Sequence, residues 1–125
     1  MIAGVGTDIV AVARLGQFYE RHGTRALEKV LAASEREDFA AASDAGRFLA
    51  KRFAAKEAFA KALGTGVVAP ASLPNIAVVH DALGKPSFAF APELAALLQS
   101  RSLVAHLSIS DEREFAVAFV VLEQA

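Results

Sequence analysis

The chain has 125 residues, of which 54% are hydrophobic, and it carries 13 basic and 14 acidic side chains and no cysteine. This length predicts one domain, 1–125, that buries enough apolar surface to fold without a disulfide. A net charge of −1 excludes the overall positive field on which non-specific nucleic-acid binding depends, so we expect no nucleic-acid partner. The longest apolar run, 115–122, is far below the roughly 20 residues that span a bilayer, and the N-terminal residues lack a basic leader. We therefore expect a cytoplasmic protein without a membrane partner.

Hydrophobic periodicity predicts one strand and several helices in the first half of the chain. The long helix is the most regular segment, because it contains no Gly, Pro or β-branched residue and Gly64 follows it as a C-cap. Ser34 and Glu37 have the spacing of a capping box, which predicts a helix start at Ser34. In chain order we expect a buried strand over 2–10, a helix over 11–22, a helical turn over 25–31, a helix from 34 to about 42 and the long helix over 47–63.

The second half is predicted to be mainly strands separated by turns. Polar residues at 110–113 form a tight connection between two apolar segments, as in a hairpin. In chain order we expect strands over 75–80 and 87–90, a helix over 92–101 and strands over 103–109 and 115–122. The sequence thus predicts a single-domain α+β fold, with a mostly antiparallel sheet packed against one long buried helix and shorter helices.

The long helix carries a charged pair within largely apolar surroundings. Glu57 and Lys61 are four residues apart and share one helix face. Two interpretations remain open, because such a pair is either an ordinary surface ion pair or part of a functional site that compensates the cost of burying charge.

Asp8 is a second candidate, since it stands near the end of an apolar strand whose glycines allow close backbone approach. A structural alternative is that Asp8 caps the following helix. If Asp8 and Glu57 converge, two carboxylates suit Mg²⁺, which prefers a few protein oxygens together with substrate phosphates. Lys61 would then supply a positive charge for the same phosphates.

Two further groups have both a functional and a purely structural interpretation. Strand alternation places His106 and Ser108 on one face, where they either belong to a site or simply face solvent. A second group forms a basic stripe at helical spacing, provided that the helix continues through Gly23. Its members are Arg14, Phe18, Arg21 and Arg25. This stripe is either a solvated face or a docking surface for an acidic helix.

Four segments together resemble the holo-acyl-carrier-protein synthases, the small 4'-phosphopantetheinyl transferases. The N-terminal Gly-x-Asp motif resembles 4–10, and the Phe-x-x-Lys-Glu-Ala-x-x-Lys motif resembles 53–61. The segments 83–86 and 106–110 follow in the same order, so the similarity covers essentially the whole chain.

The resemblance implies the 4'-phosphopantetheinyl transferase fold and transfer of phosphopantetheine from coenzyme A to a serine of an acyl carrier protein, with release of adenosine 3',5'-bisphosphate. It also implies a homotrimer with active sites between subunits. Asp8 and Glu57 would bind Mg²⁺ and Lys61 would contact the phosphates, while Glu57 and His106 are competing candidates for the base. Positions implied to contact coenzyme A are Arg52, Lys61, Gly64, Lys85, Pro86, His106 and Ser108. The stripe Arg14, Phe18, Arg21 and Arg25 would meet the carrier protein.

One position departs from the family pattern, because Asp111 stands where many members have a second histidine. Two other functions use the same residues. A Mg²⁺-dependent hydrolase of nucleotide pyrophosphates needs the same two carboxylates, and a non-catalytic module would bind coenzyme A or a carrier protein without turnover.

Overall fold

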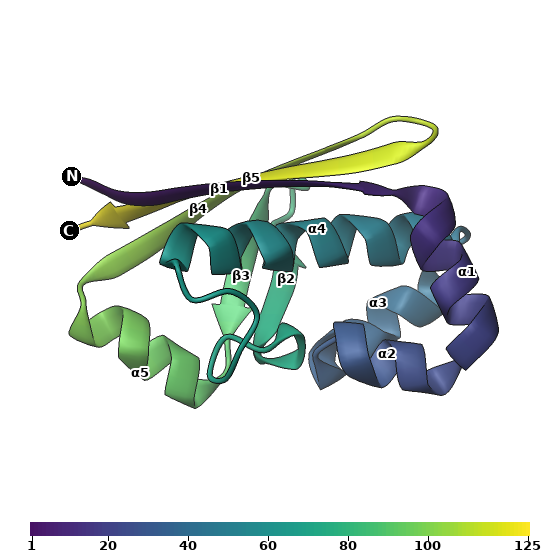
Figure 1. Ribbon diagram of the computed structural model, residues 1–125, viewed down its shortest axis with the longest axis horizontal. Helices are drawn as coiled ribbons and strands as arrows, with labels where there is room; N and C mark the ends of the chain where they lie inside the picture. Colours follow the sequence, from purple (N-terminus) through teal and green to yellow (C-terminus); the bar gives the residue numbers. More distant parts are fainter.

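Three long strands form the main sheet, in the order β1–β5–β4. Strand β1 (Ile2–Ala11) and strand β4 (Leu103–Asp111) each pair antiparallel with the central strand β5 (Phe115–Gln124). A second antiparallel sheet, β2 (Ile76–His80) with β3 (Pro86–Phe90), runs steeply across the long strands (Figure 1). This computed structural model, which describes residues 1–125, confirms the predicted α+β fold with antiparallel strands.

The longest helix, α4 (Ala45–Leu63), lies along the main sheet and covers one of its faces (Figure 1). Its first turn is capped by Asp44, whose carboxylate accepts a hydrogen bond from the Arg47 backbone N–H at 3.0 Å. Gly64 ends the helix in the left-handed conformation with φ 87°, as the sequence predicts. The helix begins two residues earlier than predicted because the cap at Asp44 adds Ala45 and Gly46.

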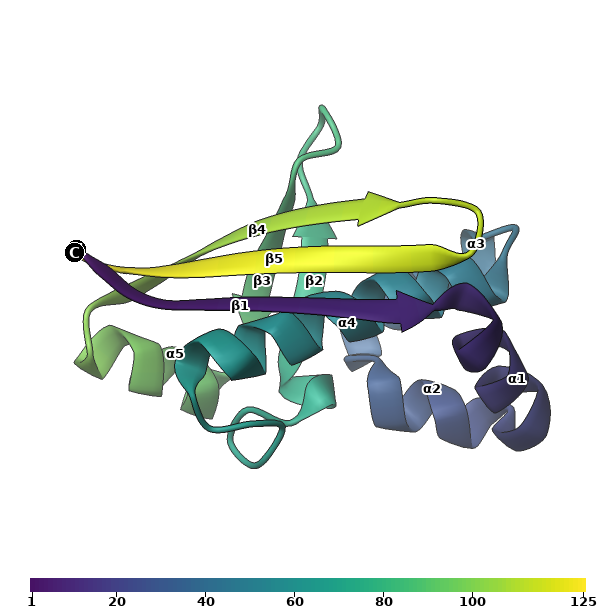
Figure 2. The same ribbon diagram turned by 45° about the horizontal axis from the view of Figure 1, so that its top comes forward.

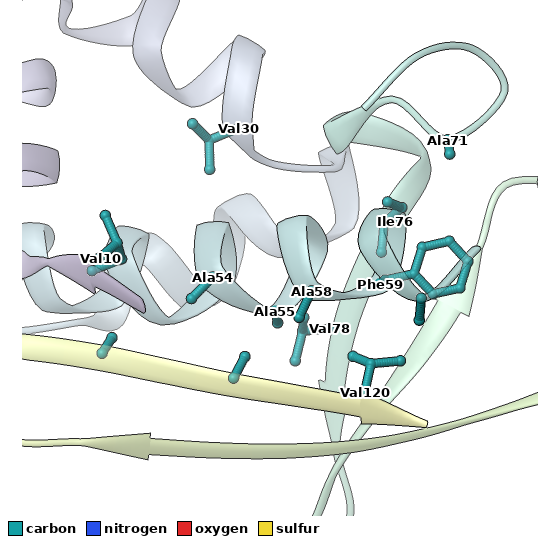
Figure 3. Packing of buried hydrophobic residues seen from close by; sticks show 14 of the residues in the cluster. Val10, Val30, Ala54, Ala55, Ala58, Phe59, Ala71, Ile76, Val78 and Val120 are labelled. Atoms are coloured by element: carbon teal, nitrogen blue, oxygen red, sulfur yellow. The ribbon is translucent and has the colours of Figure 1, made fainter. Parts of the chain in front are cut away.

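Two glycines allow β1 to pack directly on the backbone of α4. A Cβ atom at Gly6 would lie 2.0 Å from the carbonyl oxygen of Ala58, and one at Gly4 would lie 2.1 Å from that of Ala62. Only hydrogen fits at these contacts, so the strand and the helix are held in one register. The hydrophobic core around α4 consists mainly of small and branched side chains (Figure 3).

The shorter helices cluster at the two ends of α4 (Figures 1 and 2). At one end are α1 (Val12–His22), α2 (Thr24–Val30), the 3₁₀ turn η1 (Ala33–Glu35) and α3 (Arg36–Ala41). At the other end, α5 (Pro92–Ser100) precedes β4. The short turn η2 (Leu73–Asn75), which precedes β2, lies against α2 and the middle of α4.

The capping box predicted at Ser34 is wrong. Helix α3 begins at Arg36, and the carboxylate of Glu35 accepts a hydrogen bond of 2.8 Å from the backbone N–H of Ala32. The reason is tertiary, because Glu35 is drawn into the interior by buried cations from α4 and thereby sets the local turn.

The face of the main sheet opposite α4 carries no helix or strand (Figure 1). Large apolar side chains on this outer face are about half exposed, namely Val5, Ile9, Val104, Phe115 and Phe119. Several large apolar side chains exposed on one face are typical of a surface that contacts another molecule. No helix of the chain combines the length and the apolarity needed to cross a bilayer.

Candidate active site

Asp8 and Lys61 meet where β1 runs alongside the last turns of α4. The Lys61 ammonium lies 3.1 Å from the Asp8 carboxylate and donates a second hydrogen bond of 3.0 Å to the Thr7 carbonyl oxygen. The Asp8 side chain is 16% exposed and that of Lys61 is 53% exposed, so the pair sits at the surface with access for a ligand.

Glu57 belongs to the same cluster, one helical turn before Lys61. Burial and the nearby negative charge of Asp8 raise the pKa of Glu57, although Lys61 and Arg14 oppose the rise. Arg14 extends from α1, and its guanidinium lies 5.5 Å from the centre of the Phe53 ring. The structure thus brings together Asp8, Glu57 and Lys61 and adds Arg14 from a third element.

His106 and Ser108 lie elsewhere in the same chain. They alternate along β4 on the outer face of the sheet, whereas Asp8 is on the α4 side of β1. The imidazole Nε2 of His106 is 3.0 Å from the carboxylate of Glu123 on the central strand. Within one chain, the thickness of the sheet therefore lies between Asp8 and the two residues His106 and Ser108.

The remaining predicted contacts for coenzyme A are also dispersed. Lys85 and Pro86 are at the turn between β2 and β3, which projects beyond β4 (Figure 2). The Asp81 carboxylate fixes this turn by accepting hydrogen bonds of 2.9 Å from the backbone N–H groups of Leu83 and Lys85. Gly64 is at the end of α4, one turn beyond Lys61.

Arg52 turns away from Glu57 into a buried cluster. Its guanidinium donates hydrogen bonds to the Glu35 carboxylate at 2.8 Å and to the Val78 carbonyl oxygen at 2.9 Å. It also lines a cavity of about 380 Å³ next to Lys51 and His80. Burial and the positive charges of Arg52 and Lys51 lower the pKa of His80.

The sequence interpretation missed two members of this cluster, Glu35 and Lys56. Lys56 is fully buried and Glu35 is 1% exposed. Burial lowers the pKa of Lys56 to about 8, despite the opposing charge of Glu35. Burial alone would raise the pKa of Glu35, but Lys56 and Arg52 bring it below its ordinary value. The available signal was the spacing of Arg52 and Lys56, two cations four residues apart on the side of the helix away from Glu57 and Lys61.

The basic stripe is interrupted at Gly23, where φ is 55° and α1 gives way to α2. The condition on which the full stripe depends, a helix that continues through Gly23, is therefore not met, and Arg25 stands on the second helix. Arg14, Phe18 and Arg21 do converge, because they line one cavity of about 330 Å³. Lys29, Val30, Phe53 and Leu73 also line this cavity, which combines a basic rim with an apolar interior.

Asp111 makes structural contacts. Its carboxylate accepts a hydrogen bond of 2.8 Å from the Arg47 guanidinium and lies 3.8 Å from the Lys51 ammonium. Arg47 also donates to the carbonyl oxygens of Glu112 and Arg113, which fastens the hairpin between β4 and β5 to α4.

The chemistry of the cluster suits phosphate ligands. Asp8 and Glu57 offer carboxylate oxygens, which are ligands that Mg²⁺ prefers, and the ammonium of Lys61 beside them can bind a phosphate. The chain contains no group of three or more His, Cys, Asp or Glu side chains arranged to hold a metal ion. A cation at Asp8 and Glu57 would therefore complete its coordination with substrate or water oxygens.

Comparisons with known proteins agree on one family. The family model of the 4'-phosphopantetheinyl transferase superfamily matches residues 4–120. The holo-acyl-carrier-protein synthase of Dechloromonas aromatica is 64% identical over 125 residues, which cover all of both chains.

Solved structures show the same fold. The crystal structure of holo-acyl-carrier-protein synthase from Neisseria meningitidis superposes with a TM-score of 0.94 at 44% identity. The match covers 98% of this chain and 99% of that one. The Bacillus anthracis synthase in complex with CoA (3',5'-ADP) superposes with a TM-score of 0.84 at 37% identity. This match covers 100% of this chain and 99% of that one. The chain is therefore an enzyme of the holo-acyl-carrier-protein synthase family, within the 4'-phosphopantetheinyl transferase superfamily.

Proposed function

We propose that this protein transfers the 4'-phosphopantetheine group of coenzyme A to a serine of an apo acyl carrier protein, in the cytoplasm. The convergence of Asp8, Glu57 and Lys61 beside a basic docking cavity carries the proposal. The names of the relatives and the bound CoA (3',5'-ADP) of the Bacillus anthracis structure support it.

Asp8 and Glu57 would hold Mg²⁺, and their mutual repulsion supports this assignment. The charge of Asp8 contributes to the raised pKa of Glu57, so a divalent cation between them would remove an unfavourable interaction. When bound, the ion supplies charge neutralisation for the phosphate oxygens. Lys61 contributes a second positive charge from the same helix face.

The transfer replaces one phosphorus–oxygen bond by another. The serine oxygen attacks the phosphorus that bears the pantetheine arm, and the bond to the bridging oxygen breaks, releasing adenosine 3',5'-bisphosphate. Glu57 would accept the serine proton, because in this proposal its carboxylate stands beside the transferring phosphate. Positioning and charge stabilisation account for most of the acceleration in phosphoryl transfer.

The active enzyme is a homotrimer in this proposal, with each site shared between two subunits. His106 and Ser108 are on the outer sheet face and Asp8 is on the opposite one, so a single chain cannot present them to one coenzyme A molecule. The half-exposed apolar side chains beside His106 support burial of the outer face against another subunit. Arg52, Gly64, Lys85 and Pro86 would complete the contacts with coenzyme A.

The carrier protein would dock on α1 and α2. Carrier proteins are acidic, and the cavity of about 330 Å³ has Arg14, Arg21 and Lys29 at its rim. Its apolar wall, which includes Phe18, suits an apolar side chain from the partner. Arg25 on α2 would extend the same positive field.

Mass spectrometry of an apo carrier protein, incubated with the enzyme, coenzyme A and Mg²⁺, tests the function. We expect one added phosphopantetheine group on the carrier and none with Glu57→Gln. Consumption of coenzyme A without a carrier would indicate a hydrolase. Binding of coenzyme A without any turnover would indicate a non-catalytic module.

A further inference from the structure

Lys56 adjoins Glu57 in the sequence but extends to the other side of α4. Its ammonium donates hydrogen bonds to the Glu35 carboxylate, to the Val30 carbonyl oxygen at 2.6 Å and to the Leu73 carbonyl oxygen at 3.1 Å. An ammonium has three N–H donors, and all three are used here. The side chain thus joins three segments that are distant in the sequence.

Two of these acceptors form walls of the docking cavity. Val30 and Leu73 both line the cavity of about 330 Å³, together with Arg14, Phe18 and Arg21. Val30 is the last residue of α2, where helix carbonyl groups lack partners within the helix. Lys56 satisfies this carbonyl group with a cation, which also complements the helix dipole.

Glu35 holds Lys56 in this position. Its two carboxylate oxygens accept hydrogen bonds from Lys56, Arg52 and the backbone N–H groups of Ala32 and Val78. No buried side-chain nitrogen or oxygen of the chain lacks a hydrogen-bond partner. A fully satisfied buried network of this kind fixes one geometry.

From this arrangement, and resting on the proposed function, we infer that Lys56 is a positioning residue that sets the distance between the Val30 and Leu73 walls of the cavity and thereby the affinity for the carrier protein. It does not touch the reacting groups, because Glu57 and Lys61 face β1. Loss of the Lys56 ammonium should therefore raise the KM for the carrier, by about tenfold or more, and leave kcat and the KM for coenzyme A within about twofold.

The absence of cysteine allows a precise test. In Lys56→Cys the new thiol is unique, so it can be alkylated in denaturant and the protein then refolded. Bromoethylamine restores an ammonium of nearly the length of lysine, whereas bromopropane adds an uncharged group of the same size. Unmodified wild-type protein taken through the same steps is the reference.

We expect the aminoethyl form to have the carrier KM of the wild type, and the propyl form to have a raised one. A folded propyl form with the wild-type carrier KM, or with reduced kcat alone, would overturn the inference. The double variant Glu35→Gln/Lys56→Met, which removes the carboxylate and the ammonium together, is measured in parallel with the same expectation for the carrier KM. Failure of the wild type to modify any carrier would instead overturn the proposed function.

Discussion

The ammonium of Lys61 is 3.1 Å from the carboxylate of Asp8, although the two residues are 53 positions apart in the chain. This contact links the strand and the helix that carry the candidate catalytic groups. The ammonium also lies near a second carboxylate, that of Glu57. The charge of Asp8 raises the pKa of Glu57, and the charge of Lys61 opposes this rise.

Replacing Lys61 by Met should lower kcat by about a hundredfold, because one preorganised positive charge beside the transferring phosphate is lost. The KM for the carrier should change little, since Lys61 does not line the docking cavity. Steady-state kinetics with apo carrier and coenzyme A measures both constants. Arg36→Met removes a partly exposed cation from α3, away from Asp8, and serves as the control. Equal effects of the two changes would contradict the assignment.

Gly6→Ala should destabilise the protein by about 1–3 kcal/mol, because the added methyl group meets a backbone oxygen and forces β1 away from α4. The shift would also separate Asp8 from Lys61 and lower kcat. Gly16→Ala is the matched control, since its new Cβ would lie 3.8 Å from the nearest atom, an ordinary contact. Urea denaturation should show Gly16→Ala to be about 0.5–1 kcal/mol more stable than wild type. Equal stabilities of the two variants would show that the strand has room to move.

The buried cluster should make stability sensitive to acid. The pKa of Glu35 is lower in the folded protein than its ordinary value of 4.5, so the unfolded chain binds the proton more tightly. The stabilising contribution is therefore complete above that ordinary value and is lost as the pH falls through the lowered one. Urea denaturation at pH 6 and pH 3 should show a smaller loss of stability in Glu35→Gln/Lys56→Met than in wild type. An identical loss would place the acid-sensitive group elsewhere.

Arg14→Glu combined with Arg21→Glu should raise the KM for the carrier by about tenfold or more and leave the KM for coenzyme A within about threefold. Added salt should also raise the KM of the wild type for the carrier, because salt screens the attraction between exposed charges. The control is the double variant Arg36→Glu/Arg113→Glu, which changes the net charge by the same amount at positions that do not line the cavity. If both pairs gave the same KM, the effect would come from overall charge and the docking face would be elsewhere.

Phe119→Asp should dissociate the proposed trimer, because it places a charge in the middle of the apolar outer face. Light scattering should then report the mass of one chain, and transfer should fall by at least about tenfold, since His106 and Asp8 would no longer share a site. A fully active single chain would refute the shared site.

Most of the fold follows from local sequence. The strand over Ile2–Ala11 and the helix over Ala45–Leu63 have the residue types of their class, and Gly64 ends the helix as its conformational freedom predicts. The glycines of this strand indicate that another group can approach its backbone closely, and the structure shows that this group is α4.

The errors arise where a distant partner decides the local structure. The capping box at Ser34 failed because Glu35, one residue later, is engaged by Lys56 from α4. Strand alternation correctly grouped His106 with Ser108, but which sheet face they occupy depends on the pairing of three strands. The convergence of Asp8 with Glu57 was a conditional expectation, since no local pattern gives the distance between a strand and a helix.

Helix α4 presents two charged pairs to opposite sides, with Arg52 and Lys56 directed to Glu35 and with Glu57 and Lys61 directed to β1. Each residue of an α-helix advances the side-chain direction by about 100°. Inserting or deleting a single amino acid between Arg52 and Lys61 would rotate one pair away from its partners, whereas many individual side chains could be exchanged without that effect. Divergence of this segment should therefore proceed by replacement at constant length, and engineered libraries built on it should keep that length fixed.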